Sequence, residues 1–271
     1  MSCLLIFSFL IVSANATENW PNLSTTFPNF HLEPRTTSEA REGGWVKFSS
    51  CDGKFLGHRY AKHSDPSMIL IYDDAGYIAG VQSVVPVKNV HPSANLTLQP
   101  AYVLDTWFDE PAYLMTAYFV KHSVICGGGR SAEDFHLQGT GDRLFVQTGK
   151  TTHSYHTIPL TQEEADSDPA WYPHLCSNGM GLHYSQYNYD HGQDCDAVLP
   201  LLILFHNGVI HGFAWQHFAN LPGTQWEHPT ARTVRSIIHS PPKCLMKQVI
   251  ARGLSTMHTY FVDFPWTMHC P

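Results

Sequence analysis

The chain has 271 residues, of which 43% are hydrophobic and 14% are charged, and its formal net charge is −7. This composition predicts a globular protein that buries a core of its own, and it contains no basic run of the kind that nucleic-acid binding requires. After the N-terminus, no apolar stretch reaches the length of a membrane-spanning helix. Histidine is unusually frequent, because its 18 residues outnumber the 16 lysines and arginines together.

The N-terminus has the features of a secretory signal peptide. An apolar run at 3–12 is too short to span a bilayer, and the sequence Ala-Asn-Ala at 14–16 fits the small-residue rule for cleavage. No Lys or Arg precedes the run, so the alternative is a buried N-terminal strand. We predict a signal peptide at 1–16, an N-terminal extension at 17–43, and a secreted, extracellular protein. Asn22 and Asn95 head acceptor sequons and are expected to carry N-linked glycans.

Two stretches of the chain resemble each other in the same order. GWVKFSSCDGKFLGHRY at 44–60 and WYPHLCSNGMGLHY at 171–184 each contain a tryptophan, a cysteine and, seven residues after the cysteine, a histidine. A β-hairpin pattern follows at 68–83 and at 201–216. LMTAYFV at 114–120 and TMHTYFV at 256–262 then match at four of seven positions. We predict an internal duplication, although apolar strands and glycine turns also resemble one another without common descent.

The predicted repeat units are 44–126 and 171–271, with a connector at 127–170 that contains one expected strand at 144–148. The clearest helix pattern is at 231–240, and it resumes at 243–253 after two prolines. We expect an α+β or mostly β fold. In it, two strand-rich units, each a hairpin, a variable connection and a central strand, pack together.

The cysteines agree with export and define a specific pairing. Apart from Cys3, six cysteines remain, and an even number in an exported chain indicates three disulfides. Because each repeat unit begins and ends with a cysteine, the expected partners lie within one unit. The third pair joins the two cysteines that only the second unit contains. The predicted disulfides are Cys51–Cys126, Cys176–Cys270 and Cys195–Cys244.

Histidines distinguish the second unit from the first. The match between the units aligns Ala79 with His211 and Thr116 with His258, while both units keep a histidine after the first cysteine, His183 in the second. If the strands that carry them adjoin, His183, His211 and His258 converge. Three neutral imidazoles suit zinc or copper, and Met180 or Met257 would favour copper. The alternative is that these histidines are hydrogen-bonded core residues.

Aromatic residues also gather in the second unit, where Phe213 and Trp215 replace Val81 and Ser83 of the first. We predict a pocket for a small molecule or another extracellular ligand, whereas the simpler interpretation is an aromatic core. The residues predicted to bind the ligand are Tyr184, Phe213, Trp215 and Tyr260.

No standard catalytic motif occurs, so the sequence assigns no catalytic residue and leaves open whether the protein is an enzyme. The leading hypothesis is a secreted, disulfide-bonded binding protein with a histidine- and aromatic-lined pocket in the second unit. One alternative is a secreted copper- or zinc-dependent enzyme that uses the same histidines. Another is a structural extracellular protein without a pocket.

Overall fold

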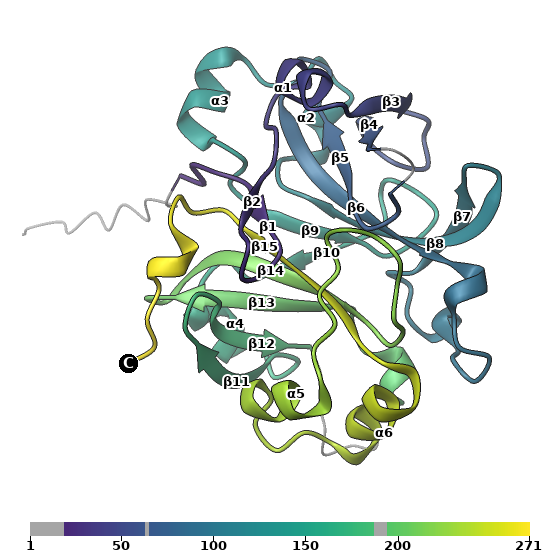
Figure 1. The fold of residues 1–271 in the computed structure, drawn as a ribbon. Coiled ribbons are helices and arrows are strands. Elements are labelled where there is room, and N and C mark those ends of the chain that lie inside the picture. Colours follow the sequence, from purple (N-terminus) through teal and green to yellow (C-terminus); the bar gives the residue numbers. More distant parts are fainter. Residues whose placement is uncertain (1–18, 63–64, 187–193) are drawn as a thin grey trace, which may run out of the picture.

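A computed structural model describes residues 19–62, 65–186 and 194–271. The predicted signal peptide at 1–16 lies outside the described residues. The described chain is mostly β, and its two antiparallel sheets face each other (Figure 1). None of the described helices has the length and apolar character needed to cross a membrane.

The first sheet has eight strands in the order β10-β9-β8-β6-β5-β4-β3, with β7 paired to β8. Its strands are β3 (Val46–Ser49), β4 (His58–Ala61), β5 (Ile69–Tyr72), β6 (Ile78–Pro86), β7 (Val103–Trp107), β8 (Glu110–Tyr118), β9 (Leu144–Gln147) and β10 (Tyr155–Ile158).

The second sheet has seven strands in the order β11-β12-β13-β14-β15-β1-β2. Its strands are β1 (Ser24–Thr25), β2 (His31–Leu32), β11 (Tyr172–Ser177), β12 (Gly181–Ser185), β13 (Leu201–His206), β14 (Val209–His217) and β15 (Ser255–Tyr260).

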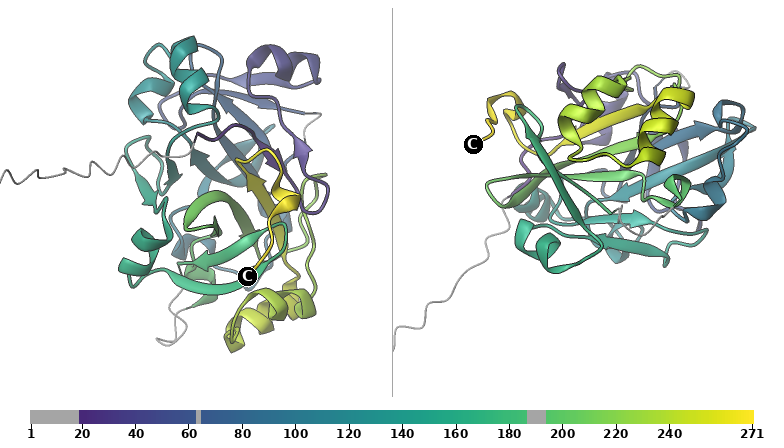
Figure 2. Two further views of the ribbon diagram at one scale, coloured as in Figure 1. Left: turned by 90° about the vertical axis from the view of Figure 1, so that its left-hand side faces the viewer. Right: turned by 90° about the horizontal axis from the view of Figure 1, so that it is seen from below.

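Short helices lie around the two sheets (Figures 1 and 2). The α-helices are α1 (Thr37–Glu42), α2 (His122–Ile125), α3 (Ala132–Gln138), α4 (Gln162–Ser167), α5 (Ala231–Ile237) and α6 (Lys243–Arg252). The expected break between the last two falls at the two prolines, which cannot continue a helix. Helices α5 and α6 lie on the side of the second sheet that faces away from the first (Figure 1).

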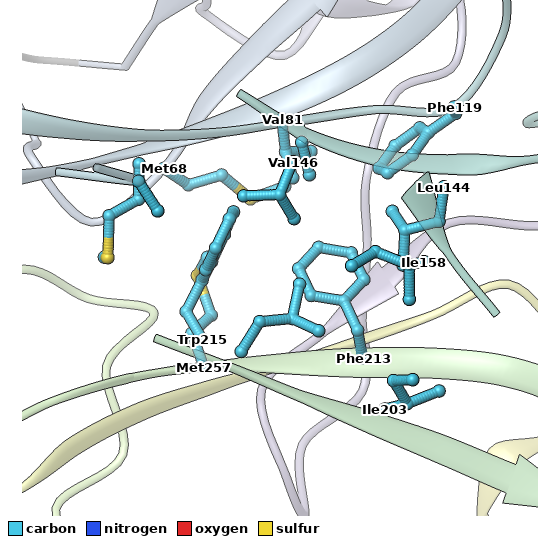
Figure 3. Close-up of a cluster of buried hydrophobic side chains, with 14 of the residues drawn as sticks. Met68, Val81, Phe119, Leu144, Val146, Ile158, Ile203, Phe213, Trp215 and Met257 are labelled. Carbon is cyan, nitrogen blue, oxygen red and sulfur yellow. The ribbon is translucent and has the colours of Figure 1, made fainter. Parts of the chain in front are cut away.

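The main core fills the space between the sheets (Figure 3). Val81 and Val146 point into it from the first sheet, and Phe213 and Trp215 point into it from the second. Complete burial of a side chain of this size contributes about 1.5–3 kcal/mol, so this layer holds the two sheets together. Both faces of the central strands are covered, which is why β5 and most of β13 are apolar runs without alternation and why all nine residues of β6 are buried.

The two sheets have matching local features. A helix with a Thr-x-x-Glu capping box precedes the edge strand of each, at Thr36–Glu39 before β3 and at Thr161–Glu164 before β11. From this edge, the next four neighbouring strands are β4, β5, β6 and β8 in the first sheet and β12 to β15 in the second. In the first sheet, β7 is inserted in the chain between β6 and β8 and pairs with β8.

The segments at 17–43 and 127–170 are more than an extension and a connector. The hairpin β1–β2 extends the second sheet beyond β15, and the hairpin β9–β10 extends the first sheet beyond β8. The segment at 127–170, where we expected one strand, therefore contains β9, β10 and two helices. The N-terminal segment thus completes the sheet that contains β11 to β15, and the segment at 127–170 completes the sheet that contains β3 to β8.

The three predicted disulfides are confirmed. The structure contains Cys51–Cys126, Cys176–Cys270 and Cys195–Cys244. The first joins the loop after β3 to the residue that follows α2. The second joins β11 to the C-terminal segment. The third joins Cys244, at the start of α6, to the segment that precedes β13.

Candidate functional site

A cavity of about 260 Å³ lies between the outer face of the second sheet and the helices α5 and α6. We call the segment 218–254, which includes these helices, the lid, and the space below it the lid cavity. The sheet side of the wall carries most of the polar groups, contributed by His183, Ser185, Gln216, Thr256 and His258. The lid side is mostly apolar, with Phe218, Val234, Ile237, Ile238, Leu245 and Leu254. An apolar pocket with a few placed polar groups is the usual form of a small-molecule site.

The structure brings two of the three predicted histidines together. The rings of His183, on β12, and His258, on β15, are both buried, with centroids 6.0 Å apart and planes nearly perpendicular. Both residues belong to the lining of the lid cavity. In each ring the Nε2 atom has no hydrogen-bond partner among the described residues. A buried polar atom without a partner is costly, so this pair is the strongest sign of a ligand site.

His183 is held as a neutral imidazole. Its Nδ1 lies 3.2 Å from the carbonyl oxygen of Leu175, which accepts hydrogen bonds only, so Nδ1 carries the proton. Burial, and then the neighbouring His258, lowers the pKa of His183 to about 3. Its Nε2 is therefore unprotonated at neutral pH and carries a free lone pair.

Glu227 orients His258. The carboxylate Oε2 of Glu227 lies 2.6 Å from Nδ1 of His258, and the hydroxyl of Thr256 and the backbone N–H of Phe27 also donate to this carboxylate. Burial raises the pKa of Glu227, but His258 and these hydrogen bonds outweigh burial and leave the pKa below its ordinary value. Glu227 is thus an ionised acceptor that fixes the proton of His258 on Nδ1.

His211 does not line the lid cavity. It lies at a β-bulge between β13 and β14, where the pairing shifts between Leu204 and Phe205. Its Nε2 hydrogen-bonds the carbonyl oxygen of Met180 at 2.8 Å, and its ring stacks on Tyr260. In the described parts of the chain, no group of three or more His, Cys, Asp or Glu side chains is arranged to hold a metal ion. A three-histidine copper or zinc site therefore stays a prediction, without support from this geometry.

The aromatic residues predicted to bind a ligand lie elsewhere. Tyr184, Phe213 and Trp215 belong to the core between the sheets, and the Tyr184 hydroxyl donates to Asp166. Tyr260 shares the outer face with His258, because the two are two residues apart on β15, but it packs with Leu204 and Met268. The lid cavity is on the opposite face of the sheet from Phe213 and Trp215, so these residues do not line it, and the expected aromatic pocket stays a prediction.

The first sheet carries different side chains at the matched positions. Strand pairing places Gln82 opposite Thr116 in the first sheet and Ala214 opposite His258 in the second. It also matches Arg59, and not His58, to His183. The Gln82 side chain accepts a hydrogen bond from Arg59 and donates one to Thr116, and Phe55 packs on the Arg59 guanidinium. Where the first sheet has a bonded glutamine, the second has an alanine and two histidines with unpartnered nitrogens.

Sequence reasoning missed Glu227 and the lid residues. Glu227 and His228 both line the cavity and lie in a loop without a recognisable motif. A usable signal was present, because the lid contains a cysteine of the one disulfide found only in the second unit. Cys195 itself lines the cavity, so this disulfide fastens the lid at its edge.

Comparison of the chain with protein-family models, with curated proteins and with solved structures found no match. The function has to be argued from the site itself.

Proposed function

We propose that this protein is an extracellular binding protein that holds a small, predominantly apolar molecule in the lid cavity. The observation that carries the proposal is one apolar cavity whose sheet side contains two buried histidine nitrogens without partners. An enclosed apolar cavity of about 150 Å³ is enough to bind benzene in another protein. The lid cavity, at about 260 Å³, has room for a ligand larger than one aromatic ring.

The contrast between the sheets supports a binding role. A core position that served stability alone would be filled and hydrogen-bonded, as Gln82 and Thr116 are. The matched position in the second sheet leaves polar atoms unpaired below an apolar lid. This arrangement costs stability, and a ligand that fills the space would recover it.

The three disulfides support an extracellular location, because such bonds persist in oxidising compartments. We also propose that residues 44–126 and 171–271 descend from one duplicated unit. The matching strand order and disulfides of these segments support this, and so does the helix with a capping box that precedes each of them. A structural protein, the third hypothesis from the sequence, has no need for the lid cavity.

Binding of N-phenyl-1-naphthylamine, an uncharged apolar fluorophore, tests the proposal. We expect a saturable fluorescence increase with one site per chain in the wild type. Ala214→Gln would place an amide beside His258, as Gln82 lies beside Thr116, and should abolish the signal while circular dichroism shows the chain folded. Ala132→Gln, the same substitution at an exposed position of α3, should bind as the wild type does. An unsaturable signal, or one unchanged in Ala214→Gln, would contradict the proposal.

The second candidate is a copper- or zinc-dependent enzyme that uses His183 and His258. In its favour, a carboxylate that holds the Nδ1 proton of a histidine, as Glu227 does for His258, is the usual support of a metal-ligating imidazole. Elemental analysis of the chain purified without a histidine tag separates the two candidates. Near-stoichiometric copper or zinc that is lost in His183→Leu would favour the enzyme, and metal-free protein that binds the fluorophore would favour the binding protein.

A further inference from the structure

The polar groups of the lid cavity restrict the chemistry of its ligand. Two of its hydroxyls already have partners, since Ser185 is bonded to His174 and Thr256 donates to Glu227. The Nε2 atoms of His183 and His258 are the buried polar atoms of the wall that lack a partner among the described residues. The head group of a ligand would therefore be recognised by these two nitrogens.

His183 requires a donor from the ligand. Its Nδ1 proton is used by Leu175, so its Nε2 accepts a hydrogen bond and cannot give one. His258 is less restrictive, because Nδ1 donates to Glu227 and Nε2 accepts in the neutral ring or donates in the protonated ring. A hydroxyl group fits both, because it donates one hydrogen bond and accepts others.

A carboxylate is a poor fit for the same site. The described lining residues include no Lys or Arg, and they include the Glu227 carboxylate. A second anion would face the lone pair of His183 in an apolar cavity, where an unpaired charge is strongly disfavoured. A plain hydrocarbon would fill the space but would leave both nitrogens without partners.

We propose that the ligand is a small uncharged molecule with an apolar body and one hydroxyl group, an aliphatic alcohol or a phenol, whose hydroxyl donates to Nε2 of His183 beside His258. This inference rests on the proposed function and specifies the ligand class of the same cavity. The apolar body would lie against the lid residues Val234, Ile238 and Leu245.

The test is displacement of N-phenyl-1-naphthylamine by three molecules that share the naphthalene ring system, namely 2-naphthol, naphthalene and 2-naphthoate. We expect 2-naphthol to displace the fluorophore at a concentration about tenfold lower than either of the others, which is the effect of one buried hydrogen bond. His183→Leu should bring 2-naphthol to the level of naphthalene. His217→Leu is the matched control. His217 is buried in the same sheet and also has an unpartnered Nε2, but it bonds Tyr102 and does not line the lid cavity.

The outcomes separate this inference from the proposed function. Equal displacement by 2-naphthol and naphthalene in the wild type would overturn the inference while the binding protein stands. Stronger displacement by 2-naphthoate would also overturn it. A wild-type chain that binds neither the fluorophore nor any of the three compounds would overturn both. The wild-type series decides the question even if His183→Leu does not fold.

Discussion

The carboxylate of Glu227 and the imidazole of His258 form the shortest polar contact in the wall of the lid cavity, with 2.6 Å between Oε2 and Nδ1. Glu227 comes from the lid and His258 from the central part of the second sheet, so this bond also fastens the lid to the sheet. The same carboxylate accepts from the backbone of Phe27 at 2.7 Å, which adds the N-terminal segment. One side chain thus joins three parts of the chain.

We expect Glu227→Ala to lower the free energy of unfolding by about 3–5 kcal/mol, because it leaves His258, Thr256 and the Phe27 amide buried without an acceptor. Chemical denaturation measures the change. Glu42→Ala removes an exposed carboxylate and should change the stability by less than about 0.5 kcal/mol. A loss in Glu227→Ala as small as in the control would show that the lid is not fastened here.

Glu33 is expected to make the folded chain less stable as the pH rises from about 4.5 to about 7. Burial raises the pKa of its carboxyl from 4.5 to about 7, against the hydrogen bond from Thr25 and the charge of Lys62. Between these values the folded state holds a proton that the unfolded state has lost, so stability falls as the pH rises and the loss is complete above the folded pKa. Glu33→Gln should therefore be more stable than the wild type by up to about 3 kcal/mol above pH 7, and the two should converge near pH 4.5. Glu42→Gln should show no such crossover in chemical denaturation.

Four buried histidines act with the opposite sign. Burial lowers the pKa of His183 and His211 to about 3 and that of His174 and His217 to about 4. The unfolded chain takes up protons near pH 6.5 while the folded chain does not, so stability is full above about pH 6.5 and is lost as the pH falls toward the folded values. Each contributes about 2–3 kcal/mol of destabilisation at pH 4.5, so together they outweigh Glu33. We expect the melting temperature to fall steeply below pH 6.5, with a shallower slope in His217→Gln but not in the exposed-site variant His91→Gln.

Much of the fold follows from patterns that the sequence displays directly. The hairpins at 68–83 and 201–216 are visible because long apolar strands meet at a turn with Gly, and the disulfides follow from the positions of six cysteines. Strands β1 and β2 were not predicted, because two residues are too few to show an alternation. Their place in the second sheet is set by pairing with β15, far away in the sequence.

The sequence indicated only part of the candidate site, because the rest depends on features that no local pattern shows. Residues two apart on a regular strand share a face, which holds for His258 and Tyr260 on β15 but not for His211, Phe213 and Trp215 on β14. The bulge at His211 shifts the alternation by one residue, and no sequence pattern announced it. Glu227 completes the site from a loop, where position depends on tertiary packing and not on a local period.

The disulfide Cys195–Cys244 is expected to control the lid and not the sheets. Each disulfide closes a long loop, with a sequence separation of 49 residues for this one and 75 for Cys51–Cys126. The loop-entropy model gives both a similar stabilisation of about 4 kcal/mol, so global stability alone would not distinguish them. Their positions do, because Cys195 lines the lid cavity, whereas Cys51, between β3 and β4, and Cys126, directly after α2, do not. Replacing both members of each pair by alanine should therefore have different local effects. The Cys195/Cys244 variant should lose amide-exchange protection in α6 and bind N-phenyl-1-naphthylamine at least about tenfold more weakly, since an ordered lid is part of the binding free energy. The Cys51/Cys126 variant should keep both as long as it is folded, and equal losses in the two variants would show that the lid is not an independently fastened element.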